Sequence, residues 1–208
     1  RESVYRTLKA RRFYATTGNR PLLRVRLQTG PGQEAHMGDV VARGGGVPRL
    51  RVEATGTAPI ESVEVLNGGT RLRTIRPYRR GQLGSRVKLL WSGSEVRGRA
   101  RMVVWDGALT VQRNSIREVQ PVNFFHPWRQ PRLLGKTRVR WQSITTGGHA
   151  GLILTLARPA AGSLEIETEQ RRTVCRIGTL GVAPRSWNCG GLDKRLAVYR
   201  LPDRSGTE

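Results

Sequence analysis

Residues 11–27, RRFYATTGNRPLLRVRL, contain the point at which the pattern of the chain changes from helical to extended. Ahead of this stretch, residues 2–12 carry apolar side chains on one side of a short amphipathic helix, and the cations of its last turn suit the helix dipole. The Thr-Thr-Gly-Asn run favours an end to the helix, and Pro21 prevents its resumption. From Leu22 onward apolar and polar residues alternate with a period of two, which is typical of strands. We therefore predict one short N-terminal helix followed by a mostly β chain.

Composition and turn signals favour a sandwich. With 25 Gly and 11 Pro in 208 residues, the chain is rich in turns and long enough for one large domain or two small ones. Two hairpins are predicted, at Asn67-Gly68-Gly69 and at Asp106-Gly107, because these residue types tolerate the positive φ of tight turns. Short strands separated by such turns predict an antiparallel β-sandwich.

The expected division of the chain has three parts. Residues 1–21 are assigned to the helix and a junction, as the end of a truncated upstream domain, since the chain starts within a helical pattern and without Met. Residues 22–126 are assigned to a β-sandwich module. The proline-bounded aromatic stretch 121–131 marks a boundary, and residues 127–208 form a second, packed β-rich module or continue the same sandwich.

The formal charge of +22 points toward acidic partners. Arginine pairs spaced by two, such as Arg24/Arg26, Arg97/Arg99/Arg101 and Arg138/Arg140, lie on one face of an expected strand. Strands with Glu at the same spacing, above all Glu165/Glu167/Glu169, are expected to interleave with them, because opposed like charges are unfavourable. A solvated charge ladder is one interpretation and a functional basic surface is the other. An aromatic content of 6% disfavours dedicated nucleic-acid binding.

No pattern of catalytic or metal-ligating residues is present in the sequence. The three histidines, His36, His126 and His149, lack the paired spacing of zinc sites. There is no Gly-x-Ser-x-Gly elbow, and the glycine run at 44–46 lacks the Lys-Ser/Thr of a phosphate loop. We therefore assign no catalytic residue, no metal ligand and no cofactor to this chain by itself. No apolar run approaches the roughly 18 residues of a membrane span.

The two cysteines, Cys175 and Cys189, leave two alternatives open. A disulfide between them would contribute on the order of 3 kcal/mol and would suit an extracytoplasmic protein. Two buried thiols are equally compatible with the sequence and would suit the cytoplasm. The localisation, extracytoplasmic or cytoplasmic, therefore stays open.

The run from Leu8 to Arg20 resembles the end of the catalytic domain in a bacterial family of unknown function, the DUF3604 type. Shorter matches are Met37-Gly38-Asp39, residues 56–64 (GTAPIESVE), residues 97–101 (RGRAR), Trp105-Asp106-Gly107, Thr145-Thr146-Gly147 and Cys189-Gly190-Gly191-Leu192-Asp193. Full-length members look like metal-dependent phosphoesterases of the polymerase-and-histidinol-phosphatase (PHP) type with a β-rich C-terminal region. The resemblance implies that catalysis belongs to a His/Asp-rich cluster upstream of Arg1, holding a divalent metal such as Mn or Zn.

The resemblance also implies which residues could border that active site. The candidates for phosphate or substrate contact, once the upstream domain is present, are Arg12, Tyr14, Thr16, Thr17 and Arg20. Guanidinium groups offer forked donors to phosphate oxygens, and hydroxyl groups adapt to them. The alternative is structural: Arg12 ends the helix, and the Thr-Gly-Asn that follows turns the chain.

The function favoured by these observations is a non-catalytic C-terminal accessory and interface region of a larger metal-dependent hydrolase, whose partner is the upstream catalytic domain of the same chain. The substrate and the oligomeric state are not indicated. One alternative is a basic binding module for nucleic acid or anionic glycan. Another is a carbohydrate-binding β-sandwich of a secreted enzyme, which would require exposed Trp residues at Trp91, Trp128 or Trp187.

Overall fold

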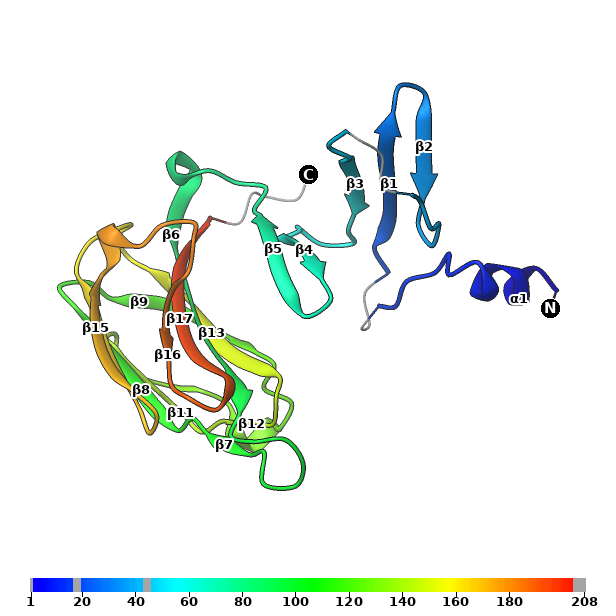
Figure 1. Ribbon diagram of the computed structural model, residues 1–208. Helices are drawn as coiled ribbons and strands as arrows, with labels where there is room; N and C mark the ends of the chain where they lie inside the picture. Colours follow the sequence, from blue (N-terminus) through cyan, green and yellow to red (C-terminus); the bar gives the residue numbers. More distant parts are fainter. Residues whose placement is uncertain (1, 17–19, 43–45, 204–208) are drawn as a thin grey trace. The chain divides into compact units, whose positions relative to one another are not determined.

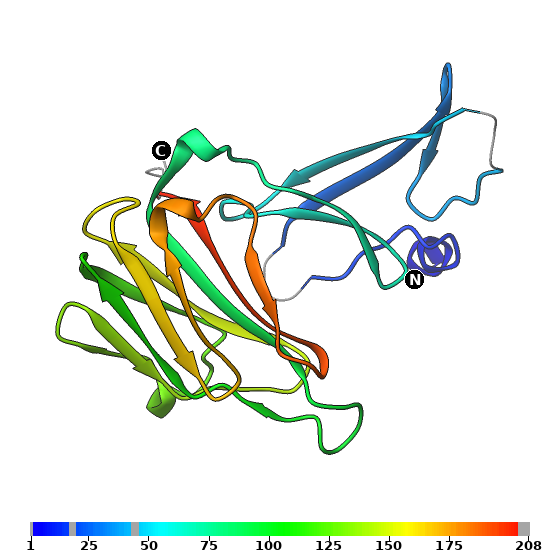
Figure 2. The same cartoon turned by 60° about the vertical axis from the view of Figure 1, so that its left-hand side comes forward.

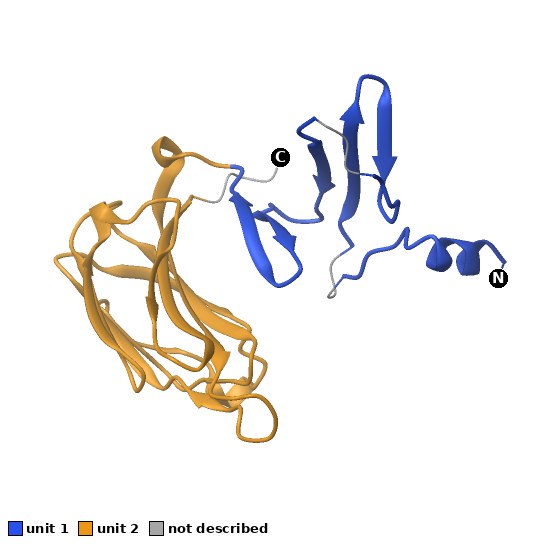
Figure 3. Cartoon of the chain, in the orientation of Figure 1, with its two compact units in different colours: residues 1–77 blue, residues 78–208 orange. Residues whose placement is uncertain are grey.

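The computed structural model describes residues 2–16, 20–42 and 46–203. The chain divides into two compact units, unit 1 with residues 1–77 and unit 2 with residues 78–208 (Figure 3). Strands are the main regular secondary structure of both units and pair antiparallel, so the prediction of a mostly β fold with one short N-terminal helix is confirmed. The described residues include no helix long and apolar enough to cross a membrane.

Unit 1 contains the helix and two small sheets (Figure 1). Its elements are α1 (Glu2–Lys9), β1 (Leu22–Gly30), β2 (Gln33–His36), β3 (Arg49–Thr55), β4 (Val63–Asn67) and β5 (Thr70–Ile75). Strand β1 lies between β2 and β3, and β4 pairs with β5. The hairpin predicted at Asn67-Gly68-Gly69 is confirmed: Asn67 pairs with Thr70, and Gly68 has a φ of 56°. Ala35 is the one buried residue among those described in this unit.

Unit 2 is a sandwich of two five-stranded sheets (Figures 1 and 2). The first sheet has the order β16-β17-β6-β13-β9 and the second β10-β11-β8-β14-β15. The first is made of β6 (Leu83–Ser94), β9 (Ile116–Val122), β13 (His149–Leu156), β16 (Arg185–Asn188) and β17 (Leu192–Pro202). The second is made of β8 (Gly107–Gln112), β10 (Arg132–Leu134), β11 (Arg138–Trp141), β14 (Ser163–Thr168) and β15 (Arg172–Arg176). A short pair, β7 (Val103–Val104) with β12 (Ile144–Thr145), and the 3-10 turns η1 (Arg80–Gln82), η2 (Pro127–Arg129) and η3 (Ile177–Thr179) complete the unit.

The core of unit 2 follows from the period of two along its strands. Side chains of alternating residues reach the inner face of each sheet, and both inner faces contribute to one continuous apolar cluster. From the first sheet come Val87, Leu89, Trp91, Leu152, Leu154, Leu196 and Val198; from the second come Leu109, Val111, Val139, Trp141, Leu164 and Ile166. The predicted antiparallel β-sandwich is therefore present in this unit.

Three tryptophans of this core, Trp91, Trp105 and Trp141, make hydrogen bonds through their indole N–H groups. Trp91 and Trp141 stack with ring centroids 5.0 Å apart and an interplanar angle of 9°. The indole N–H of Trp141 donates to the carbonyl oxygen of Trp105 at 2.7 Å. The indole N–H groups of Trp91 and Trp105 donate to the hydroxyls of Ser143 and Thr145, each at 2.9 Å. Each indole therefore places its large apolar surface in the core without leaving its N–H unpaired.

The hairpin predicted at Asp106-Gly107 is wrong. Strand β7 pairs with β12, while β8 lies between β11 and β14. The Asp106 carboxylate instead accepts the backbone N–H of Ser143 at 2.9 Å, so it joins segments far apart in the sequence. The Asp-Gly pair therefore does not form a tight hairpin turn here, and the Asp106 side chain makes a long-range hydrogen bond instead.

The boundary expected near Pro127 does not divide the structure. Strand β13 pairs with β6 and β9, and β11 pairs with β8, so residues on both sides of position 126 share the same two sheets. The division falls between residues 77 and 78 instead. Residues 127–203 therefore continue the sandwich that begins at Leu83, and β1 to β5 lie outside it.

Candidate functional site

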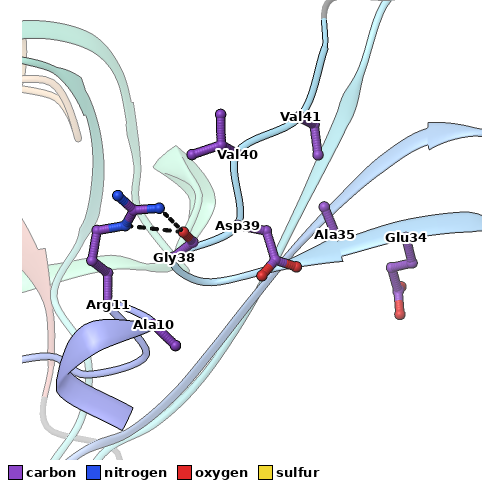
Figure 4. Close-up of a pocket in the computed structure, with 8 residues that line it drawn as sticks. All are labelled: Ala10, Arg11, Glu34, Ala35, Gly38, Asp39, Val40 and Val41. Atoms are coloured by element: carbon purple, nitrogen blue, oxygen red, sulfur yellow. Dashed lines mark hydrogen bonds between the residues drawn. The ribbon is translucent and has the colours of Figure 1, made fainter. Parts of the chain in front are cut away.

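Arg11 and Arg12, which follow α1, form hydrogen bonds with the segment that follows β2. The Arg11 guanidinium donates from Nε and Nη2 to the carbonyl oxygen of Gly38 at 3.2 and 3.0 Å (Figure 4). Arg12 Nη2 donates to Asp39 Oδ1 at 3.0 Å. The segment directly after α1 and the segment directly after β2 are therefore in contact within unit 1.

Asp39 is held as a carboxylate by two donors. The backbone N–H of His36 donates to Asp39 Oδ2 at 2.8 Å, and Arg12 donates to the other oxygen. Together they lower the pKa of Asp39 below its ordinary value, with the His36 hydrogen bond as the larger cause and Arg12 next. Asp39 therefore caps the turn after β2 through His36 and binds the segment after α1 through Arg12.

Gly38 is required by the close approach of these two segments. Its φ is 92°, a conformation that L side chains rarely adopt. A Cβ at this position would lie 2.1 Å from the carbonyl oxygen of Ala10. No local pattern in the sequence around Met37-Gly38-Asp39 predicts this contact with Ala10.

A shallow pocket of about 440 Å³ lies beside the segment that Arg11 binds. Figure 4 shows the residues that line it. Its lining combines Arg11 with the carboxylates of Glu34 and Asp39, and the rest is small or apolar: Ala10, Ala35, Gly38, Val40 and Val41. The cation is already bonded to Gly38. Two carboxylates beside a committed arginine disfavour a phosphate here, because they repel an anion.

The structure does not gather the five predicted contact residues into one cluster within its described part. Arg12 is paired with Asp39, and the Tyr14 hydroxyl donates to the carbonyl oxygen of Pro21 at 2.9 Å. Thr16 and Arg20 are exposed. Thr17 lies outside the described residues. Helix α1 ends at Lys9, so Arg12 does not end the helix as considered from the sequence, and its ion pair lies in the segment that follows.

Removal of Arg12 is expected to raise the pKa of Asp39. The pKa of Asp39 is lower in the folded chain than in the unfolded chain, where it is about 3.9. The carboxylate therefore contributes its full stabilisation at pH values above the unfolded-state pKa, and this contribution is lost as the pH falls through the folded-state pKa. An NMR titration of the Asp39 carboxyl carbon should give a midpoint below that of a free Asp. In Arg12→Gln the midpoint should rise only part of the way to that of a free Asp, because the His36 hydrogen bond remains.

Arg20→Gln is the control, because it removes one exposed charge of the same unit. It should leave the midpoint almost unchanged. An equal effect of both variants would contradict the ion pair.

Cys175 and Cys189 are free thiols, so the disulfide considered from the sequence is not formed. Cys175 is buried on β15 as a member of the core, and burial raises the pKa of its thiol. Cys189 is half-buried at the end of β16, where its Sγ donates to the Trp187 carbonyl oxygen at 3.7 Å, and burial raises its pKa as well. Raised thiol pKa values disfavour reactivity at neutral pH.

The charge ladder expected between Arg138/Arg140 and the glutamates of β14 is not formed directly, because Thr110 and Ala108 of β8 lie between them on the outer face of the second sheet. In register, Arg140 of β11 faces Ala108 of β8, which faces Glu167 of β14, and Arg172 of β15 follows. Arg172 pairs with Glu167, and also with Glu165 at 3.9 Å. Arg97, Arg99 and Arg101 lie instead in the loop between β6 and β7, where the strand expectation is wrong.

Five aromatic side chains of the described residues are exposed: Tyr5, Phe13, Tyr14, Phe125 and Trp128. Trp91 is fully buried, and Trp187 is half-buried, with the Arg185 guanidinium 5.3 Å from its ring centroid. Trp128 is 73% exposed, and Phe125 nearby in the sequence is 83% exposed. Of the three tryptophans on which carbohydrate binding would depend, only Trp128 is well exposed.

The described residues hold no group of three or more His, Cys, Asp and Glu side chains placed to bind a metal ion. Comparison with protein-family models, with curated protein sequences and with solved structures finds no match. Function must therefore be argued from the residues and surfaces of the chain itself.

Proposed function

We propose that this chain is the non-catalytic C-terminal accessory and interface region of a larger metal-dependent hydrolase of the phosphoesterase type. In this proposal unit 1 docks on the catalytic domain that precedes it in the same polypeptide, and unit 2 is a self-contained sandwich. The observation that carries the proposal is the unequal burial of apolar side chains in the two units.

Unit 1 leaves apolar side chains uncovered. Helix α1 buries none of its residues. Val4, Tyr5 and Leu8 are 61, 55 and 50% exposed, and their spacing places them on one face. An eight-residue helix is shorter than the roughly 12–15 residues that an isolated helix needs, so its stability depends on packing. These features support a partner that covers this face of α1.

Unit 2 needs no such partner. Its inner strands bury an extended core, in which Val87, Leu89 and Trp91 are among the fully buried residues. The contrast between a complete core in one unit and a single buried residue in the described part of the other favours different roles for them.

The catalytic domain of the same chain is the occupant that we infer. The resemblance assigns the run from Leu8 to Arg20 to the end of that domain, and this run includes Arg11 and Arg12, which bind the segment after β2. Docking would cover the face of Tyr5 and Leu8. Thr16 and Arg20, which are exposed, would then be free to contact a substrate phosphate.

The test combines activity with binding. We expect the 208-residue chain alone to leave bis-p-nitrophenyl phosphate unhydrolysed with added Mn²⁺ or Zn²⁺. The domain encoded ahead of Arg1, expressed separately, should bind the chain, and Tyr5→Glu with Leu8→Glu should abolish binding. Val96→Glu, at an exposed apolar residue of unit 2, is the control and should bind normally. Metal-dependent turnover by the chain alone, or a preceding sequence without His-x-His and further His/Asp ligands, would overturn the proposal.

A second candidate is a binding module for anionic glycan or nucleic acid. The exposure of Phe125 and Trp128 beside Arg129 favours it, because aromatic rings and arginine together form stacking sites for such polymers. A salt titration decides it: tight binding that falls steeply with salt supports this function, and no binding at low salt removes it.

A further inference from the structure

A cavity on unit 2 combines cationic and hydroxyl side chains without a carboxylate. It has a volume of about 730 Å³ and lies where β8 ends, β14 begins and β15 passes into η3. The polar residues that line it are Gln112, Arg113, Ser163, Arg176 and Thr179, and the remaining lining residues are Gly or Ala. Its size lies within the roughly 300–1,000 Å³ of small-molecule sites.

Strand register places three of these side chains next to one another. Gln112 faces Ser163, and Ser163 faces Arg176. They point away from the core, because they alternate with the buried Val111, Leu164 and Cys175. Directly opposed residues on one sheet face lie about 5 Å apart. The amide of Gln112, the hydroxyl of Ser163 and the guanidinium of Arg176 can therefore bind the same group of a ligand.

One wall of the cavity is held by the hydrogen bonds of Asn114, which does not belong to the lining. The buried Asn114 donates from Nδ2 to the carbonyl oxygens of Arg158 and Ala161 at 2.7 and 2.9 Å. Its Oδ1 accepts the backbone N–H of Ser115 and of Arg158. The turn after β8 is thereby joined to the loop before β14. A site built this way loses little conformational entropy when it binds a ligand.

Gly162 brings the two walls close together. Its φ is 82°, and a Cβ there would lie 2.1 Å from the carbonyl oxygen of Gln112. Its own carbonyl oxygen accepts the backbone N–H of Ile177 at 3.0 Å, which fixes the start of η3. The Thr179 hydroxyl donates to the Arg176 carbonyl oxygen at 2.8 Å, so its oxygen keeps lone pairs for a further donor.

Both arginines of the cavity are uncommitted. Within the described part of the chain, no hydrogen bond or ion pair engages the guanidinium of Arg113 or Arg176. The nearest acidic strand, β14, directs Glu165 and Glu167 to Arg172 instead. Two free guanidinium groups in a concave site without a carboxylate attract an anion that accepts several forked hydrogen bonds.

We propose that this cavity binds the phosphate group of a small phosphorylated molecule, with Arg113 and Arg176 as the charged donors and Gln112 and Ser163 as neutral ones. The site lies wholly within unit 2. It therefore goes beyond the proposed docking function and does not depend on it.

The experiment is an NMR titration of the complete chain with inorganic phosphate and with glycerol 3-phosphate, at a fixed ionic strength of about 0.15 M so that long-range attraction is screened. We expect saturable shifts confined to residues around 112–114, 160–163 and 176–179. Arg113→Gln and Arg176→Gln should each weaken the affinity about tenfold or more, as the loss of a charged hydrogen bond predicts.

Arg117→Gln is the matched control, because it removes one exposed charge from β9 outside the cavity lining. It should change the affinity less than about twofold, and the spectra of all three variants should retain the dispersion of the folded chain. Tighter binding of the ester than of inorganic phosphate would support a small phosphorylated ligand. Shifts spread over the basic surface, equal weakening by Arg117→Gln, or no saturation with either probe would overturn the site.

Discussion

Replacement of Trp141 by Ala is expected to lower the free energy of unfolding of unit 2 by about 3–5 kcal/mol, the range for truncating a buried large aromatic residue. The side chain is 4% exposed, stacks on Trp91 and donates to the Trp105 carbonyl oxygen. The substitution would remove this packing and leave that buried acceptor without its donor. All five tryptophans lie in unit 2, so urea unfolding followed by tryptophan fluorescence reports this unit selectively.

Trp128→Ala is the control for this prediction. Trp128 belongs to the same unit but is 73% exposed, so its removal should change the free energy of unfolding by no more than about 0.5 kcal/mol. A loss below about 1 kcal/mol in Trp141→Ala would show that the tryptophan stack does not support the core as described.

Gly38→Ala is expected to detach the end of α1 from the segment after β2. The Ala side chain would have to adopt a left-handed φ, and its Cβ would meet the Ala10 carbonyl oxygen at 2.1 Å. A strained φ costs on the order of 1–3 kcal/mol, and contact with a backbone atom cannot be relieved by a rotamer change. The hydrogen bonds from Arg11 to Gly38 and from Arg12 to Asp39 should be lost together. Amide exchange at Ala10, Arg11 and Arg12 should become at least about tenfold faster, since tenfold corresponds to 1.4 kcal/mol.

Gly32→Ala separates the two causes. Gly32 has a φ of 70° in the turn between β1 and β2, yet no atom lies within 4 Å of an added Cβ. It therefore carries the conformational strain without the clash, and exchange at residues 10–12 should be unchanged. If Gly38→Ala also left those amides unchanged, the close approach of the two segments would be contradicted.

Local features of the fold could be predicted from the sequence, whereas pairing between distant segments could not. Asn67-Gly68-Gly69 makes a hairpin because the turn and both strands are adjacent. Alternation along β14 predicted that Glu165 and Glu167 share one face, whereas their pairing with Arg172 was not predicted. Asp106-Gly107 has the same local signal as the first hairpin, but the bond to Ser143 involves a residue 37 positions away.

The same limit applies to the candidate sites. Arg12 was singled out as a phosphate contact, but its partner Asp39 lies 27 positions further along the chain, and no local pattern joins them. The cavity with Arg113 and Arg176 is assembled by the pairing of β8, β14 and β15. No motif in the sequence around either arginine predicts that it belongs to a binding site.

Burial explains why the unit boundary was misplaced. The aromatic stretch 121–131 looked like a connector, yet Phe124 packs edge-on against Trp91 with centroids 6.1 Å apart, inside the sandwich. The true change occurs at residue 77, after which Tyr78 already packs with Tyr199 and Leu201 in unit 2. The sequence around Pro77 carries no run of turn residues to signal it.

The most direct test of the proposed role is the amide exchange of α1, residues Glu2–Lys9, measured in this chain alone and in the longer polypeptide that the proposal requires. If the catalytic domain covers the face of Val4, Tyr5 and Leu8, exchange along α1 should slow by about a hundredfold or more in the longer protein, equivalent to about 2.8 kcal/mol of added protection. Strands of unit 2 should exchange equally in both. Equal exchange of α1 in the two proteins would contradict the assignment of unit 1 as a docking element.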